Sequence, residues 1–81
     1  MSRNGYKSEL LAAQLSAAMR SALLEAIFDN RGWMLQAPPV EVARMLLAMK
    51  LVRKVADNFQ ITIAGMGARA TIARQANLHR R

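Results

Sequence analysis

A change of hydrophobic period late in the chain constrains the fold more than any other feature. In residues 59–63, Phe, Ile and Ile alternate with Gln and Thr, which is the period of a half-buried β-strand. The basic run 51–55 precedes them and is also strand-like. Residues 56–58 between the two runs include Asp and Asn, which accept the positive φ angles of tight turns. The sequence therefore predicts a β-hairpin from these two runs, in a chain whose other patterns are mostly helical.

A first helix is predicted over residues 8–28, which are rich in alanine and leucine and contain no glycine or proline. The Asn and Gly of residues 29–32 suit the left-handed conformation that ends a helix. Within the helix, Ala18, Ala22 and Ala26 leave room for another helix to approach closely. We therefore expect this helix either to pack on its own domain or to form the seam of a homodimer.

A short strand and a second helix are expected next. Residues 33–35 form a brief apolar run, and the two prolines after it suit the first turn of a helix. This helix is predicted over residues 39–50. Its inward-facing positions are Val42, Ala43, Leu46 and Met49, whereas Arg44 and Lys50 face solvent.

A last helix is predicted to begin near Thr62 or Ala64 and to reach about Ala76, while residues 1–7 and 77–81 fray. Residues 1–81 leave room for one small domain. Its expected fold class is α+β, mainly α, with the order helix, short strand, helix, β-hairpin, helix.

The net charge of +7 lies entirely in the second half of the chain. Residues 1–41 carry equal numbers of basic and acidic side chains, whereas residues 42–81 carry eight arginines and lysines against Asp57 alone. A basic field on one part of a small domain attracts polyanions, of which nucleic acid is the commonest. The alternative is a domain that its charge keeps soluble and monodisperse.

The composition argues against enzymatic, cofactor and membrane functions. The chain has no cysteine and a single histidine, so neither a thiolate metal site nor a histidine-based triad has its residues. The apolar run 10–19 is about half as long as a bilayer crossing requires. We therefore expect a protein of the cytoplasm that is no enzyme and uses no metal or cofactor.

Residues 51–54, the Ile-Thr-Ile-Ala-Gly segment 61–65 and Ala68-Arg69 resemble the end of a winged helix-turn-helix domain. In MarR-like and related bacterial regulators, a recognition helix runs into a Leu-Val-Arg strand, a wing turn and a strand that ends in Leu-Thr-x-x-Gly. The resemblance covers residues 39–72 and is truncated, because only one helix fits between the first strand and the hairpin. It implies that residues 39–50 form the recognition helix and residues 57–58 the wing tip.

The resemblance and the charge together predict a small winged-helix-like DNA-binding protein, a transcriptional regulator or accessory factor that is a homodimer. Double-stranded DNA is its expected partner, with contacts mostly to phosphates. The alternative is a compact inhibitor or adaptor, of the kind that phages encode, that docks on an acidic surface of a larger host protein. The candidate nucleic-acid-binding residues are Arg44, Lys50, Arg53, Lys54, Gln60, Arg69 and Arg74.

Overall fold

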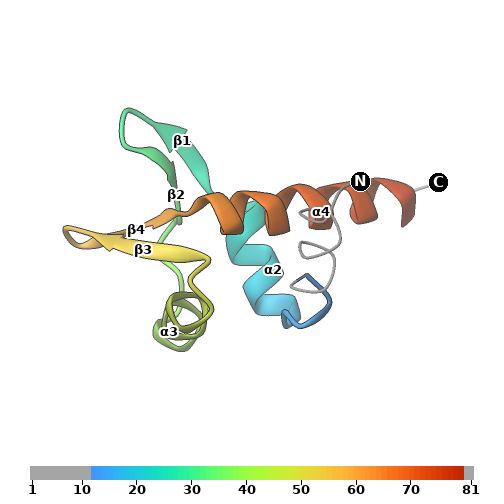
Figure 1. Ribbon diagram of the computed structural model, residues 1–81, viewed down its shortest axis with the longest axis horizontal. Coiled ribbons are helices and arrows are strands. Elements are labelled where there is room, and N and C mark those ends of the chain that lie inside the picture. The colour runs from blue at the N-terminus through green and yellow to red at the C-terminus, as the bar shows by residue number, and fades with distance from the viewer. Residues whose placement is uncertain (1–11, 80–81) are drawn as a thin grey trace.

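Three helices and a four-stranded antiparallel sheet make up residues 12–79, the part of the chain that the computed structural model describes (Figure 1). The order of elements is α2 (Ala17–Leu24), β1 (Ile27–Asp29), β2 (Gly32–Met34), α3 (Val40–Ala48), β3 (Val52–Val55), β4 (Asn58–Ile61) and α4 (Ile63–His79). The fold class and the order helix, strand, helix, hairpin, helix are confirmed. The fraying expected for residues 1–7 and for the last two residues lies outside the described residues, and α4 continues three residues beyond the predicted Ala76.

The first helix is shorter than the sequence predicts. The hydroxyl of Ser16 accepts a hydrogen bond from the backbone N–H of Met19 at 3.2 Å, so a new helix begins there and the predicted helix is interrupted. The predicted continuation to Phe28 is also wrong. Ile27 and Phe28 instead belong to β1, which pairs with β2.

The residues predicted to end that helix form the turn of a hairpin. The Asp29 carboxylate accepts a hydrogen bond from the backbone N–H of Arg31 at 2.7 Å, and Gly32 takes up a φ of +104°. These Asx and glycine features suit a hairpin turn as well as a helix end. Strand-forming residues on both sides of the turn favour the hairpin over the helix end. The short strand predicted at residues 33–35 is therefore the second strand of a β1–β2 hairpin.

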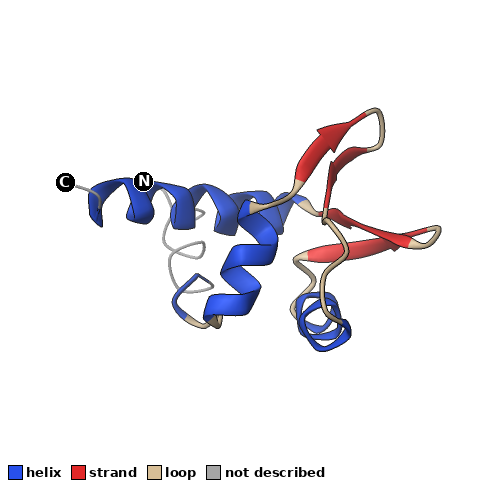
Figure 2. Ribbon diagram, turned by 180° about the vertical axis from the view of Figure 1, so that it is seen from behind, coloured by secondary structure: helices blue, strands red, loops and turns tan. Residues whose placement is uncertain are grey.

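The two hairpins share one sheet with the strand order β1-β2-β4-β3 (Figure 2). The seam between them is narrow. Met34 pairs with Gln60, and the backbone N–H of Leu35 donates to the carbonyl of Phe59 at 2.9 Å. The predicted second hairpin is confirmed, but its second strand β4 runs from Asn58 to Ile61 and not over residues 59–63. Ile63, predicted to lie on the apolar side of the strand, is the exposed first residue of α4. Away from the seam the two hairpins diverge, and both project on the side opposite the C-terminal half of α4.

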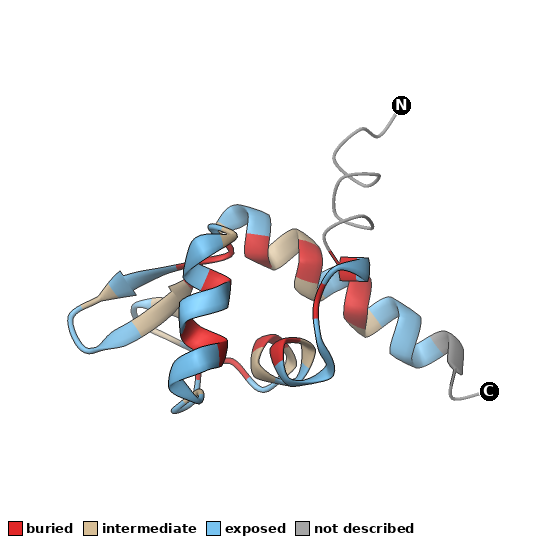
Figure 3. Ribbon diagram, turned by 90° about the horizontal axis from the view of Figure 1, so that it is seen from below, coloured by how far each residue is buried: buried red, intermediate tan, exposed pale blue. Residues whose placement is uncertain are grey.

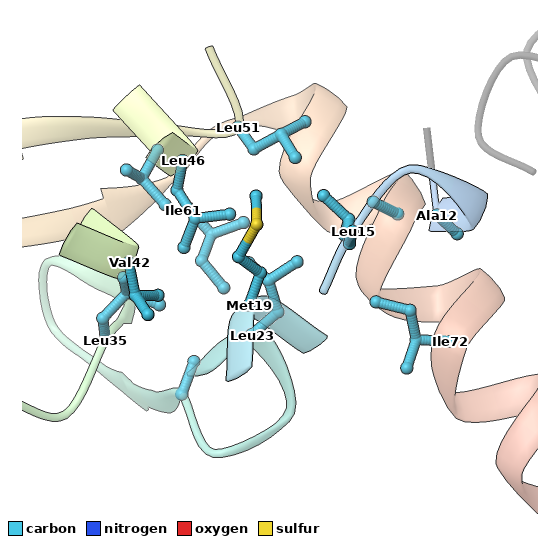
Figure 4. Close-up of a cluster of buried hydrophobic side chains, with 13 residues drawn as sticks. Ala12, Leu15, Met19, Leu23, Leu35, Val42, Leu46, Leu51, Ile61 and Ile72 are labelled. Atoms are coloured by element: carbon cyan, nitrogen blue, oxygen red, sulfur yellow. The ribbon is translucent and has the colours of Figure 1, made fainter. Parts of the chain in front are cut away.

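The core lies where α2, α3 and the first half of α4 meet the sheet (Figure 3). The buried face of α2 supplies Met19 and Leu23 to its centre (Figure 4). On α3, the predicted inward positions Val42, Ala43 and Leu46 are buried and Met49 is half-buried. Non-polar burial of this kind is the main stabilising force in so small a domain. The cluster consists of Ala12, Leu15, Met19, Leu23, Ala26, Leu35, Val42, Leu46, Leu51, Val52, Ile61, Ala68 and Ile72.

The start of α4 is joined to the start of β3 by a dense set of backbone contacts. The backbone N–H of Thr62 donates to the carbonyl of Leu51 at 3.0 Å, and its hydroxyl donates to the carbonyl of Lys50 at 2.8 Å. The same hydroxyl accepts a hydrogen bond from the N–H of Gly65 at 3.1 Å. Any Cβ on residue 65 would collide with the Leu51 carbonyl oxygen and come 2.6 Å from Ile61 Cγ2. Glycine is therefore required here for close approach, although it weakens the helix by itself.

We expect Gly65→Ala to destabilise the protein by about 3 kcal/mol, the upper end of what overpacking a core costs, because the added methyl meets backbone. Chemical denaturation followed by circular dichroism measures this. The matched control is Ala64→Gly, which changes one methyl at the exposed neighbouring position and should cost no more than about 1 kcal/mol. A Gly65→Ala protein as stable as the wild type would contradict the close approach.

Candidate nucleic-acid interface

Four of the seven candidate residues lie along one stretch of chain, from α3 into β3. Arg44 is exposed on α3 and forms an ion pair with the equally exposed Glu41, with 3.8 Å between Nη1 and Oε2. Lys50 follows α3, and Arg53 and Lys54 are exposed on β3. Because successive residues of a strand point to opposite faces, the hairpin carries a cation on each face.

Lys50 occupies a backbone position that usually belongs to glycine. Its φ is +63°, and its backbone N–H donates to the carbonyl of Leu47 at 2.9 Å. The next N–H, that of Leu51, donates to the carbonyl of Leu46 at 3.0 Å, and the side chains of Leu46 and Leu51 are both fully buried. This is a Schellman ending of α3, in which the left-handed residue is most often glycine. Lysine has a Cβ, so it adopts this left-handed backbone conformation only with steric strain.

Gln60 is half-buried, and its side-chain amide is held by hydrogen bonds to both neighbouring segments of the sheet. It is the cross-strand partner of Arg53, whose Nε–H donates to Gln60 Oε1 at 2.6 Å. The Nε2 of Gln60 donates in turn to the backbone carbonyl of Arg31 in the β1–β2 turn. The structure therefore brings Arg53 and Gln60 together and ties both to the other hairpin.

Arg31 in that turn is already paired with an acid. Its guanidinium Nη2 lies 2.8 Å from Asp29 Oδ2, and its backbone N–H donates to Oδ1 of the same carboxylate. The hydrogen bond from the Arg31 side chain, followed by the one from its backbone, holds the pKa of Asp29 below its ordinary value. Asp29 therefore offsets the charge of Arg31, whereas within residues 12–79 the side-chain partner of Arg53 is the uncharged Gln60 and no acid.

Arg69 has an internal role. Its guanidinium carbon lies 4.4 Å from the centroid of the Trp33 ring, and its Nε and Nη2 donate to the carbonyls of Leu23 and Leu24 at 2.9 and 3.4 Å. It thus closes the C-terminal end of α2 and covers a half-buried tryptophan. This use within the fold sets Arg69 apart from the cations of the hairpin.

Arg74 is exposed on the second half of α4. That half of the helix extends beyond the core and away from both hairpins (Figure 1). The structure therefore does not bring Arg74 to the hairpin cations.

Sequence reasoning missed an apolar groove between α3 and β4. It has a volume of about 270 Å³ and is lined by Pro38, Val40, Ala43, Arg44, Leu47 and Phe59. Val40 is 74% exposed and Leu47 is 37% exposed. Lys54 pairs with Phe59 across the hairpin and so shares its face. The spacing of Val40 and Leu47, two turns apart on one helix, is the only signal that the sequence offers for this groove.

Comparison with known proteins gives no further guide: the chain matches no family model, no curated protein and no solved structure. Within residues 12–79, no cluster of three or more His, Cys, Asp or Glu side chains is placed to hold a metal ion. In the same range, no helix combines the length and the apolar character needed to cross a bilayer.

We expect Lys50→Gly to stabilise the protein by about 1 kcal/mol, because glycine takes up the left-handed conformation without the steric cost of a Cβ. Thermal or urea unfolding measures the change. Ala48→Gly, at an exposed helical position two residues earlier, is the control and should destabilise by up to about 1 kcal/mol. Loss of stability in Lys50→Gly would show that the lysine side chain supports the fold itself.

Proposed function

We propose that this chain is a small cytoplasmic DNA-binding protein, acting as a transcriptional regulator or accessory factor, that grips the phosphate backbone with the β3–β4 hairpin and the end of α3. One observation carries the proposal: residues 42–56 contain four exposed cations and no acid. Phosphate contacts from lysine and arginine dominate the affinity of most DNA-binding proteins. Association into a homodimer through the segment 8–28, of which α2 is the helical part that the structure describes, is part of the proposal.

The shape of the hairpin supports simultaneous contacts with the phosphate backbones of both DNA strands. The major groove, about 12 Å wide, admits a two-stranded ribbon. Arg53 and Lys54 lie on opposite faces of such a ribbon, so each faces a different wall of the groove when the ribbon enters. A cation on each face suits this arrangement better than a single basic face does.

The strained backbone at Lys50 also supports a role for its side chain. Among the described residues, Lys50, Ala37 and Ala56 are the non-glycine residues with a positive φ, and Lys50 is the one of these three that carries a charged side chain. Lys50 lies in the short connection between α3, which carries Arg44, and β3, which carries Arg53 and Lys54. A lysine in the place of the favoured glycine gives this surface one more phosphate contact.

The exposed residues of α3 indicate binding that depends weakly on base sequence. They are Val40, Glu41, Arg44, Met45, Leu47 and Ala48. Asn, Gln, Ser and Thr, which hydrogen-bond to base edges, are missing from this helix. In the proposed complex α3 therefore supports the hairpin and adds Arg44, while the recognition is mainly of phosphates.

The proposal is tested by Arg53→Ala combined with Lys54→Ala. The change should weaken binding to unrelated duplexes alike and should lower the slope of log K against log salt concentration by about 2, since each phosphate contact contributes roughly 0.9. Fluorescence anisotropy across a salt series measures both quantities. The control Arg80→Ala with Arg81→Ala removes the same charge elsewhere and should change the slope less. Undetectable binding by the wild type at low salt would refute the proposal.

The apolar groove favours a second function, the docking of an acidic segment of a larger protein. Val40, Leu47 and Phe59 offer an apolar floor, and Arg44 and Lys54 supply positive charge at its edge. An apolar side chain flanked by carboxylates is complementary to this surface.

Val40→Glu tests the second function because it places an acid at the most exposed residue of the groove. In a pull-down from nuclease-treated bacterial lysate, the wild type should retain one stoichiometric protein and Val40→Glu should lose it. Met45→Glu, on the same helix but outside the groove, should retain it. Equal retention by all three proteins would exclude docking at the groove.

A further inference from the structure

A row of hydrogen bonds crosses the sheet from the β1–β2 turn to β3. It begins at Asp29, which holds the guanidinium and the backbone N–H of Arg31. The carbonyl of Arg31 accepts from Gln60 Nε2, and Gln60 Oε1 accepts from the Nε–H of Arg53. Gln60 is half-buried in the middle of this row, and its strand pairs with both neighbours.

The hydrogen bond from Arg53 Nε–H to Gln60 Oε1 determines which part of the Arg53 guanidinium faces outward. Arginine has five N–H donors in a planar fork. The Nε–H is taken by Gln60, so the two Nη groups keep their donors in a fixed direction. Such a pair of nitrogens binds one phosphate through two parallel hydrogen bonds.

A shallow hollow lies beside this pair of residues. Its volume is about 360 Å³, and Arg53, Gln60, Thr62 and Ile63 line it. Ile63 is 93% exposed at its edge, so the hollow is open to solvent. The hollow therefore offers space for a phosphate group beside the Arg53 side chain.

We propose that Gln60 is a positioning residue that orients Arg53 toward a DNA phosphate and makes no DNA contact itself. This assignment rests on the proposed function, because it names how one cation of that surface is held. An exposed arginine loses rotamer freedom on binding a phosphate, and an arginine already held by a neighbour loses less. The β1–β2 turn fixes Gln60 and thereby takes part in binding, although it lies on the other hairpin.

Gly32 shows how closely the turn and Gln60 fit. A Cβ on this residue would come 2.7 Å from Gln60 Nε2, and its φ of +104° already disfavours other residues. A side chain at position 32 would therefore displace the Gln60 amide. The turn leaves room for the amide because this residue is glycine.

Gln60→Met tests the inference because methionine keeps the length of the side chain and removes both hydrogen bonds. Duplex affinity, measured by anisotropy, should fall between about two- and tenfold, the range expected when one side chain loses its preorganisation. The salt slope should stay at the wild-type value, since no phosphate contact is removed. Arg53→Ala, in contrast, should lower the slope by about 0.9. Gln75→Met, on the exposed face of α4, is the control and should change neither quantity.

The double variant distinguishes a positioning role of Gln60 from a direct contact of Gln60 with DNA. If Gln60 acts only through Arg53, Gln60→Met combined with Arg53→Ala should bind no more weakly than Arg53→Ala alone. Additive losses, or a changed preference among duplex sequences in Gln60→Met, would overturn the inference and make Gln60 a direct contact.

A measurement without DNA separates failure of this inference from failure of the proposed function. In the NMR spectrum of the free protein, the Arg53 Nε–H should be ordered in the wild type and in Gln75→Met, and mobile in Gln60→Met. An equally mobile Nε–H in all three proteins overturns the positioning role, whatever the DNA result. A wild type that binds no duplex but has an ordered Nε–H refutes the proposed function and the phosphate as its ligand.

Discussion

Leu51 is the residue on which the arrangement of the domain depends most. Its side chain is fully buried in the core, and its N–H closes the end of α3. Its carbonyl accepts the N–H of Thr62, and Gly65 packs directly against that carbonyl. One residue therefore fixes the end of a helix, the start of β3 and the approach of α4. Both ends of the β3–β4 hairpin are therefore joined to the core at this point.

The proposed DNA-binding surface follows from this junction. Lys50 and Arg53 lie on either side of Leu51 and Val52, which are both buried. Both cations are exposed, and the buried residues between them anchor the backbone that carries them in the core. A rigid frame with exposed cations is the arrangement that loses least entropy on binding a polyanion.

The arginines of this domain have different roles. Arg53 is exposed on the hairpin, whereas Arg69 lies over Trp33 and closes α2. Arg31 is neutralised by the carboxylate of Asp29 two residues away. All three arginines contribute equally to the net charge. An arginine paired with a carboxylate or packed within the fold, however, attracts a phosphate less strongly than an exposed arginine without an acidic partner. The useful charge of the surface is therefore smaller than the composition indicates. It is concentrated on β3 and on Lys50, because Arg44 on α3 is itself paired with Glu41.

The sequence by itself determined the elements whose pattern is local. The β3–β4 hairpin, the buried face of α3 and the start of α4 are as expected, because period and turn chemistry act over a few residues. The alternation predicted to continue to Ile63 fails at its end, since β4 stops at Ile61 and α4 begins with an exposed Ile63. The tertiary structure decided the rest. Whether residues 27–29 continue a helix or form a strand depended on a pairing partner, and the roles of Gln60 and Arg69 depended on residues 29 and 46 positions away. Contacts over such distances leave no periodic trace in a single sequence, since they arise only when the chain folds back on itself.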